Sequence, residues 1–232
     1  FMKILLAYSS KTKNTKKVAE AIYEQIKDQG EVDLLDIKKQ RKKLEKEYDF
    51  YILGAWTDKT NANKNMQRFI DQQEIHSKDV ALFLTCGVPR EHYHADDSIN
   101  NYISFMKERN NRIHETFVCQ GKVDPKVMIV FKILTWRDPN FIHKVTPDLA
   151  DMVKESKKHP DPKDLKDAQN CFNNLLKHKL GQEQWLMLEC QHFWRPRQEE
   201  YLSPGFQDQP GQHSEIPSLY THTRVWWHAH TH

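Results

Sequence analysis

The feature that most constrains the fold is a regular alternation of short apolar runs with longer segments of helical spacing. The strand-like runs are residues 2–8, 32–37, 50–53, 80–85 and 114–119. Between them lie segments in which apolar residues recur every three or four positions, the spacing of an amphipathic helix. Strands that alternate with helices build βαβ units and a parallel sheet. We therefore predict a doubly wound α/β domain with five parallel strands and helices on both faces.

Further helices are predicted beyond the fifth strand. Asp124-Pro125 and Thr146-Pro147 each combine an N-cap residue with a proline at the first helical position. A last helix is expected from about Pro162 to Lys177. The predicted domain thus has extra C-terminal helices after its sheet is complete.

Three glycines follow predicted strands directly: Gly54, Gly87 and Gly121. Glycine permits tight turns and lets the backbone approach a ligand closely. In an open α/β sheet the ligand binds at the carboxyl ends of the strands, where the strand order reverses. Each glycine alone is an ordinary turn residue, but three at equivalent strand ends indicate a ligand-binding edge.

The loop between the first strand and the first helix, Ser9 to Thr15, is rich in short polar side chains. Ser10, Thr12, Asn14 and Thr15 stand at a helix N-terminus, where backbone N–H groups and small hydroxyls can surround a phosphate. The same residue types are also good helix N-caps. The loop by itself is therefore compatible with a phosphate site and with a simple capped helix.

Residues 2–26 resemble the start of a flavodoxin. The family's phosphate motif, S/T-x-T-G-N-T, is matched by Ser10 to Thr15 except that Lys13 stands where the family has glycine. If this position requires a positive φ, lysine costs roughly 1 kcal/mol there, while its ammonium favours a phosphate dianion. The resemblance implies a flavodoxin-like five-stranded sheet of order 2-1-3-4-5 that holds flavin mononucleotide (FMN).

The resemblance also implies which loops hold the flavin. Flavodoxins place an aromatic residue after the third strand to stack on the ring, a role that Trp56 fits. The loop after the fourth strand binds the other ring edge, with Cys86 as a small wall residue rather than a nucleophile and Tyr93 as a candidate second stacking partner. No catalytic side chain and no metal site are predicted. The predicted cofactor-binding set is Ser9, Ser10, Lys11, Thr12, Lys13, Asn14, Thr15, Ala55, Trp56, Thr57, Thr85, Cys86, Gly87, Val88 and Tyr93.

Residues 143–147 and 159–165 resemble a subgroup of flavodoxin-like proteins with an extended C-terminal helical segment. Members of that subgroup occur as small accessory partners of reductases, including flavin-dependent bilirubin reductases. The resemblance implies a redox partner, either a reductase or an acceptor protein, without identifying it.

Composition changes abruptly near residue 180. Lysine is frequent before this point and occurs once in the last 54 residues, where Gln, Pro and His dominate. We therefore predict one FMN-binding domain over residues 2–178 and a poorly structured tail over 179–232. Our hypothesis is that this tail is not native to the domain.

Net charge, cysteine spacing and the length of the first apolar run indicate which partners and which cellular compartment to expect. The net charge of +3 is too small to argue for a nucleic-acid partner. The four cysteines are scattered without a C-x-x-C pair, which favours reduced thiols. The first apolar run is too short for a signal peptide or a membrane span. These features predict a cytoplasmic protein with no nucleic-acid or membrane partner.

The predicted function is one-electron transfer through FMN, by a carrier in preference to a stand-alone oxidoreductase. One alternative is a flavin-dependent NAD(P)H reductase, which needs a nicotinamide site for which no second glycine-rich loop or arginine cluster is seen. Another is a degenerate domain that has lost FMN and serves as a binding module, for which Lys13 is the best support.

Overall fold

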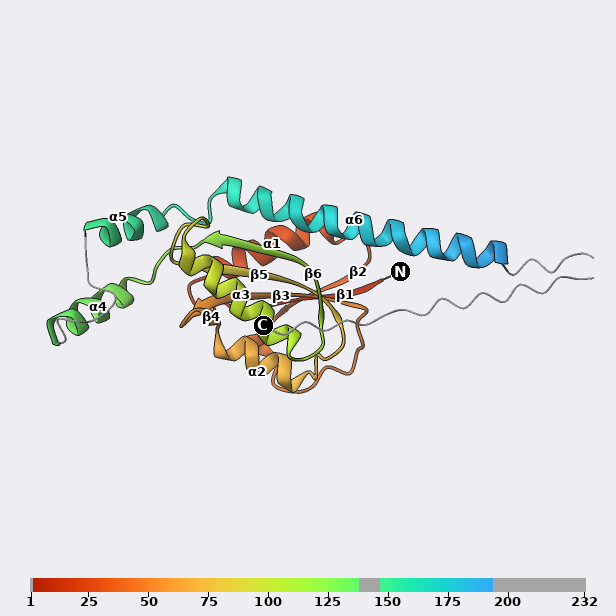
Figure 1. The fold of residues 1–232 in the computed structure, drawn as a ribbon, viewed down its shortest axis with the longest axis horizontal. Helices are drawn as coiled ribbons and strands as arrows, with labels where there is room; N and C mark the ends of the chain where they lie inside the picture. Colours follow the sequence, from red (N-terminus) through yellow and green to blue (C-terminus); the bar gives the residue numbers. More distant parts are fainter. Residues whose placement is uncertain (1, 138–146, 194–232) are drawn as a thin grey trace, which may run out of the picture. The chain divides into compact units, whose positions relative to one another are not determined.

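In the computed structural model of the protein, residues 2–137 and 147–193 are described. Five parallel strands form the central sheet (Figure 1), in the order β2-β1-β3-β5-β6. The strands are β1 (Lys3–Tyr8), β2 (Glu31–Asp36), β3 (Phe50–Asp58), β5 (Asp79–Cys86) and β6 (Arg112–Gln120). A two-residue strand, β4 (Asn61–Ala62), pairs antiparallel with the end of β3. This order confirms the predicted flavodoxin-like topology. The fourth and fifth parallel strands are numbered β5 and β6 because the short β4 precedes them in the chain.

Helices connect the strands and continue after them. They are α1 (Asn14–Ile26), α2 (Lys64–Gln72), α3 (Tyr93–Lys107), α4 (Pro125–Arg137), α5 (Pro147–Ser156) and α6 (Pro162–Phe193), with a 3-10 turn at Ile37–Lys39. Helices α1 and α6 lie together on one face of the sheet, and α2 and α3 lie on the other (Figure 1). The extra C-terminal helices are therefore present, and α6 completes the cover of one face.

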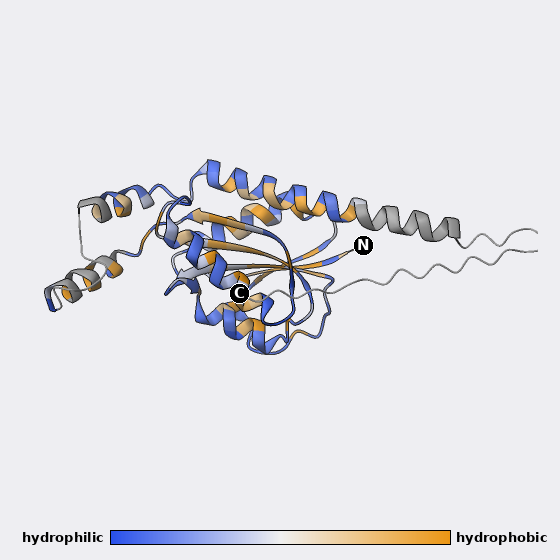
Figure 2. Cartoon of the chain, in the orientation of Figure 1, coloured by the Kyte–Doolittle hydropathy of each residue, from blue (hydrophilic) through white to orange (hydrophobic). Residues whose placement is uncertain are grey.

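Strict alternation along the strands supplies both faces of the core. In β1, Ile4 and Leu6 pack with α1 and α6, while Leu5 and Ala7 pack with α2 and α3. All four side chains are buried. Because side chains alternate across a strand, a sheet covered on both faces has continuously apolar strands. Figure 2 shows this as hydrophobic colour along the central strands between more polar helices.

The third strand is longer than predicted. It continues to Asp58, so Gly54 and Trp56 lie inside β3 and not in a loop after it. Gly54 pairs with Phe83 on β5, and a Cβ atom at Gly54 would lie 1.9 Å from the Phe83 ring. The expectation of a turn glycine at this position is wrong, because Gly54 makes room for a neighbouring aromatic ring.

The last helix is also longer than predicted, since α6 runs to Phe193 and not to Lys177. Contacts account for the first residues of this extension. Leu180 packs against the core of the α1 face, and the Lys179 ammonium lies 3.3 Å from the Asp79 carboxylate and 4.9 Å from the centre of the Phe50 ring. The predicted boundary between residues 178 and 179 falls inside this helix, and residues 194–232 of the predicted tail lie outside the described residues.

Among the described residues, no helix is both long enough and apolar enough to cross a membrane.

Candidate functional site

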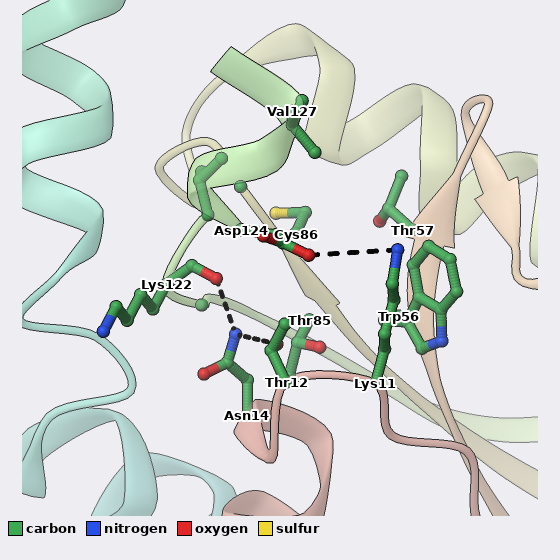
Figure 3. A pocket seen from close by; sticks show the side chains of 13 residues that line it. Lys11, Thr12, Asn14, Trp56, Thr57, Thr85, Cys86, Lys122, Asp124 and Val127 are labelled. Atoms are coloured by element: carbon green, nitrogen blue, oxygen red, sulfur yellow. Dashed lines mark hydrogen bonds and ion pairs between the residues drawn. The ribbon is translucent and has the colours of Figure 1, made fainter. Parts of the chain in front are cut away.

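A cavity of about 200 Å³ opens at the carboxyl edge of the sheet (Figure 3). The ends of β3 and β5 and the loops that follow β1, β5 and β6 contribute to it, as expected for the carboxyl edge of an open parallel sheet. Its lining residues are Lys11, Thr12, Asn14, Trp56, Thr57, Thr85, Cys86, Gly87, Gly121, Lys122, Val123, Asp124 and Val127.

Helix α1 begins at this cavity without a side-chain cap. Its N-cap residue is Lys13, which has φ 69° and ψ 0° and makes no capping hydrogen bond. The N–H of Lys17 donates to the Lys13 carbonyl at 3.0 Å, so the N–H groups of residues 14–16 have no partner within the helix. The sequence is also compatible with an ordinary helix start that a side chain caps. The structure contains no such cap at the start of α1.

Helices α4 and α6 are capped by side chains, whereas α2, like α1, starts without a side-chain cap. The Asp124 carboxylate accepts from the Lys126 N–H at 3.0 Å at the start of α4, as the Asp-Pro pair predicts. At the start of α6, Asp161 and Asp164 each accept from the backbone N–H of the other, at 2.8 and 2.9 Å. The uncapped start of α1 is a contrast to these ends, and it presents a partial positive charge beside the cavity.

The hydroxyls in and around the first loop divide into two groups. Ser9 accepts from the Asn63 amide at 2.8 Å, and the hydroxyls of Thr15 and Thr85 lie 2.9 Å apart, so these side chains hold the loop to its neighbours. Ser10 Oγ and Thr57 Oγ1, by contrast, are buried without a hydrogen-bond partner in the structure. A buried polar group without a partner costs about 1–3 kcal/mol, so each one calls for an explanation, of which a bound ligand is one. Gln29 Oε1, away from the cavity, is a third such atom among the described residues.

Asn14 joins two sides of the cavity. Its amide donates to Thr12 Oγ1 at 3.0 Å and to the Lys122 carbonyl at 2.9 Å (Figure 3). A Cβ atom on Gly121 would lie 2.8 Å from the Asn14 amide nitrogen. Gly121 therefore allows the loop after β6 to approach the start of α1 closely enough for this bridge.

Trp56 forms one wall of the cavity from β3. Its backbone N–H donates to Asn63 Oδ1 at 3.3 Å, and the side chain is partly exposed. The Lys11 ammonium lies 5.7 Å from the centre of the Trp56 ring and 3.9 Å from the Asp124 carboxylate (Figure 3). Lys11 thus spans the mouth of the cavity between an aromatic face and a carboxylate.

Cys86 has the properties of a wall residue. Burial raises the pKa of its thiol to about 11, so the thiol is neutral near pH 7. It donates to the Val88 carbonyl at 3.2 Å. Since the thiolate is the nucleophilic form, these features support the interpretation of Cys86 as part of the pocket wall.

The structure brings together eight residues of the predicted cofactor-binding set as cavity lining: Lys11, Thr12, Asn14, Trp56, Thr57, Thr85, Cys86 and Gly87. Six others, Ser9, Ser10, Lys13, Thr15, Ala55 and Val88, belong to the same chain segments without lining the cavity. Tyr93 is not among the lining residues. Its side chain is 63% exposed, stacks on the His92 ring and lies tilted against the His94 ring at the start of α3.

Sequence reasoning left the fourth lining segment out of the predicted set. This segment consists of Gly121, Lys122, Val123, Asp124 and Val127. The signal was present, because Gly121 follows the fifth predicted strand as Gly87 follows the fourth. A Cβ atom on Gly87 would lie 2.8 Å from the Val123 side chain, so the two segments meet where both glycines stand.

This fold defines an α/β domain of the doubly wound class, with a cavity at the carboxyl edge of its sheet. Comparison with known proteins identifies the family of this domain. The flavodoxin domain family matches residues 5–173. The chain therefore belongs to the flavodoxin domain family.

The curated relatives include two proteins with the same description. The chain is 31% identical over 176 residues to the flavodoxin-like domain-containing protein BilS of Clostridioides difficile (strain CD3), across 75% of this chain and 97% of the relative. It is 23% identical over 175 residues to BilS of Clostridium symbiosum (strain WAL-14163), across 71% of this chain and 90% of the relative. Among solved structures, it is similar to a flavodoxin from the domain Archaea, with 18% identity, a TM-score of 0.47, and coverage of 76% of this chain and 98% of that one.

Proposed function

We propose that this protein binds FMN at the carboxyl edge of its sheet and passes electrons through it. The observation that carries the proposal is the pair of buried hydroxyls, Ser10 Oγ and Thr57 Oγ1, that have no partner within the described structure. One belongs to the loop that opens α1 and the other to the strand that carries Trp56. A ligand that reaches from the first loop to the Trp56 wall would contact Thr57, which lines the cavity, and would lie beside the loop that carries Ser10.

The residues of the first loop fit a phosphate group. The free N–H groups at the start of α1 and the Ser10 hydroxyl are donors, and the Lys11 and Lys13 ammonium groups add positive charge. Asn14, fixed by the Lys122 carbonyl, holds Thr12 at the same loop. These hydrogen-bond donors are either neutral or positively charged, and an anionic phosphate monoester requires donors of both kinds.

The conformation of Lys13 supports FMN binding over loss of the cofactor. The position that carries glycine in the family motif keeps a positive φ here, 69°, although lysine has a steric penalty in this region. The loop thus retains its backbone shape after losing its glycine. A degenerate domain under no demand for this shape would gain roughly 1 kcal/mol by relaxing it.

The other end of the cavity fits a flat apolar ring. Trp56 offers an aromatic face, and Thr57 a hydroxyl that can donate to a ring or side-chain acceptor. Once bound, FMN would supply the redox chemistry. The chain would orient it, exclude water from it and tune its reduction potential through the nearby lysines, without an acid, base or nucleophile of its own.

Reductive titration tests this proposal and separates it from the reductase alternative. The protein is loaded with FMN, reduced with dithionite in the absence of oxygen, and mixed with a one-electron acceptor. A carrier returns to its oxidised spectrum by donating to the acceptor, and it shows no steady oxidation of NADPH. Sustained NADPH turnover by the loaded protein would instead support the reductase.

A further inference from the structure

Helix α4 exposes large apolar side chains to solvent. Ile129, Val130 and Ile133 are about half exposed, and Trp136 is 83% exposed. They stand at i, i+1, i+4 and i+7, so they form one stripe along the helix. Exposed apolar side chains that gather on one surface mark an interaction site, whereas single ones are ordinary. We call this stripe the α4 face.

The α4 face carries positive charge at both ends. Lys126 precedes Ile129 by three positions, Arg137 follows Ile133 by four, and both are exposed. Residues 125–137 contain no aspartate or glutamate. The α4 face is thus an apolar centre between two cations, with no carboxylate of its own helix to neutralise it.

The same helix belongs to the wall of the candidate cofactor site. Val127 lines the cavity, and the cavity mouth beside it carries the exposed lysines Lys11 and Lys122. Because Val127 stands on the opposite side of α4 from the stripe, a molecule seated on the α4 face would be separated from the group bound in the cavity by the width of this one helix.

We propose that the α4 face is the docking surface for a redox partner protein whose own surface carries carboxylates around an apolar centre. This inference rests on the proposed function, because it assigns to that site the partner that exchanges electrons with it. Trp and Arg are the residue types that most often dominate the binding free energy of an interface, and Trp136 and Arg137 stand together on the α4 face.

Charge argues against a second copy of this chain, and the contact of α4 with the cavity argues against a membrane surface. A second copy of this chain would bring like charges together at Lys126 and Arg137, which opposes association. A membrane-surface helix has a polar face opposite its apolar one, but α4 places Val127 toward the cavity on its other side. A protein partner satisfies both the charge and the need for a redox centre nearby.

Surface plasmon resonance at several salt concentrations tests the inference, with and without FMN. The probe is a plant-type [2Fe–2S] ferredoxin, a small acidic redox protein, and cytochrome c serves as a basic probe. Two variants remove the two parts of the α4 face, Lys126→Glu with Arg137→Glu for charge and Trp136→Ser for the apolar centre. Lys3→Glu with Lys107→Glu, two exposed lysines elsewhere, matches the first variant, and Tyr93→Ser, another exposed aromatic, matches the second.

We expect the ferredoxin to bind and the cytochrome not to bind. The α4 charge variant should weaken ferredoxin binding about tenfold at low salt and remove most of its salt dependence. Trp136→Ser should weaken it roughly fivefold at every salt concentration, because the apolar contribution is not screened. Neither matched control should change affinity as much. These results hold with or without FMN, so they remain informative if FMN binding fails.

Several results would overturn the inference. Wild type that does not bind the ferredoxin at low salt is one, and equal effects of the α4 variants and their controls are another. Binding to phosphatidylserine vesicles that depends on Trp136 would assign the α4 face to a membrane. A dimer in sedimentation that Trp136→Ser dissociates would assign it to a second copy.

Discussion

The two ends of the sheet differ in how completely their polar groups are partnered. At the amino end, the Asp79 carboxylate lies 2.7 Å from His114 Nε2, 2.8 Å from Arg112 Nε and 3.3 Å from the Lys179 ammonium. At the carboxyl end, the hydroxyls of Ser10 and Thr57 are buried without partners and α1 starts without a cap. Gln29 Oε1, just before β2 at the amino end, is also buried without a partner among the described residues, so the contrast lies in the uncapped helix start and the two hydroxyls gathered at the carboxyl end, which we assign to a ligand.

The largest expected effect is at the amino end. Asp79→Ala leaves the partly buried Lys179 and His114 without their shared carboxylate. Removing one partner of such a group costs about 2–4 kcal/mol of unfolding free energy. Urea denaturation measures this loss, and FMN affinity should be unchanged because Asp79 is at the opposite end of the sheet. An Asp79 variant that loses FMN binding and keeps its unfolding free energy would contradict the assignment of stability to the amino end and of ligand binding to the carboxyl end.

The pH dependence of stability sharpens the same prediction. Burial acts to raise the pKa of Asp79, but the hydrogen bond with His114 and the charge of Lys179 outweigh it and hold the pKa below its usual value. A lowered pKa in the fold contributes stability above the unfolded pKa of about 4, and this contribution is lost as the pH falls through the folded pKa. Asp79→Asn should therefore flatten the fall in unfolding free energy below pH 4.

At the carboxyl end, Trp56→Ala should act on the ligand. If Trp56 stacks on the flavin, its removal weakens FMN binding by about 1–3 kcal/mol and relieves the quenching of flavin fluorescence. Tyr93→Ala is the matched variant, because the Tyr93 ring does not line the cavity and its loss should leave affinity unchanged. Equal effects of the two variants would show that the loop at the start of α3 closes on the flavin.

Removing either unpartnered hydroxyl should have a smaller effect. The effect should be neutral or favourable on thermal stability without FMN and unfavourable on FMN affinity. Ser10→Ala and Thr57→Val remove groups that have no partner in the ligand-free protein, so thermal stability without FMN should hold or rise slightly. Each should weaken FMN binding by about 1 kcal/mol, the net worth of a hydrogen bond. Thr85→Val is a contrast, since it breaks the hydroxyl pair with Thr15 and should destabilise the ligand-free protein.

The smallest expected effects come from Lys13. Lys13→Gly should raise the unfolding free energy by at most about 1 kcal/mol, because glycine adopts a positive φ without strain. Loss of the ammonium should also lower the reduction potential of bound flavin, by about 30 mV or 0.7 kcal/mol. Lys13→Asn separates the two, since asparagine tolerates this conformation and lacks the charge. An equal or higher potential in both variants would contradict the electrostatic role.

Much of the fold could be predicted because its signals are local. Alternating apolar runs and helical spacing identify the five parallel strands and the helices between them, and the Asp124-Pro125 pair marks the start of α4. The ends of elements were less accurate where a distant contact decides them. Gly54 is explained by the Phe83 ring on another strand, and the continuation of α6 past Lys177 by the salt bridge of Lys179 to Asp79.

The candidate site was predictable to a similar degree. Strand ends and the family motif identify the first three lining segments, since sequence order and strand order together place them at one edge. The segment from Gly121 to Asp124 depends on Asn14, whose bridge to the Lys122 carbonyl joins positions 108 residues apart. The division between partnered Ser9 and unpartnered Ser10 depends on Asn63 in the same way. Such long-range pairings leave no trace in local spacing.

Titration of flavin-free protein with FMN, followed by flavin fluorescence, tests the central claim most directly. We predict saturable binding of one FMN per chain with strong loss of fluorescence, as expected for a flavin held against Trp56 at the carboxyl edge of the sheet. Fluorescence that stays proportional to added FMN, in protein shown by circular dichroism to be folded, would contradict the claim.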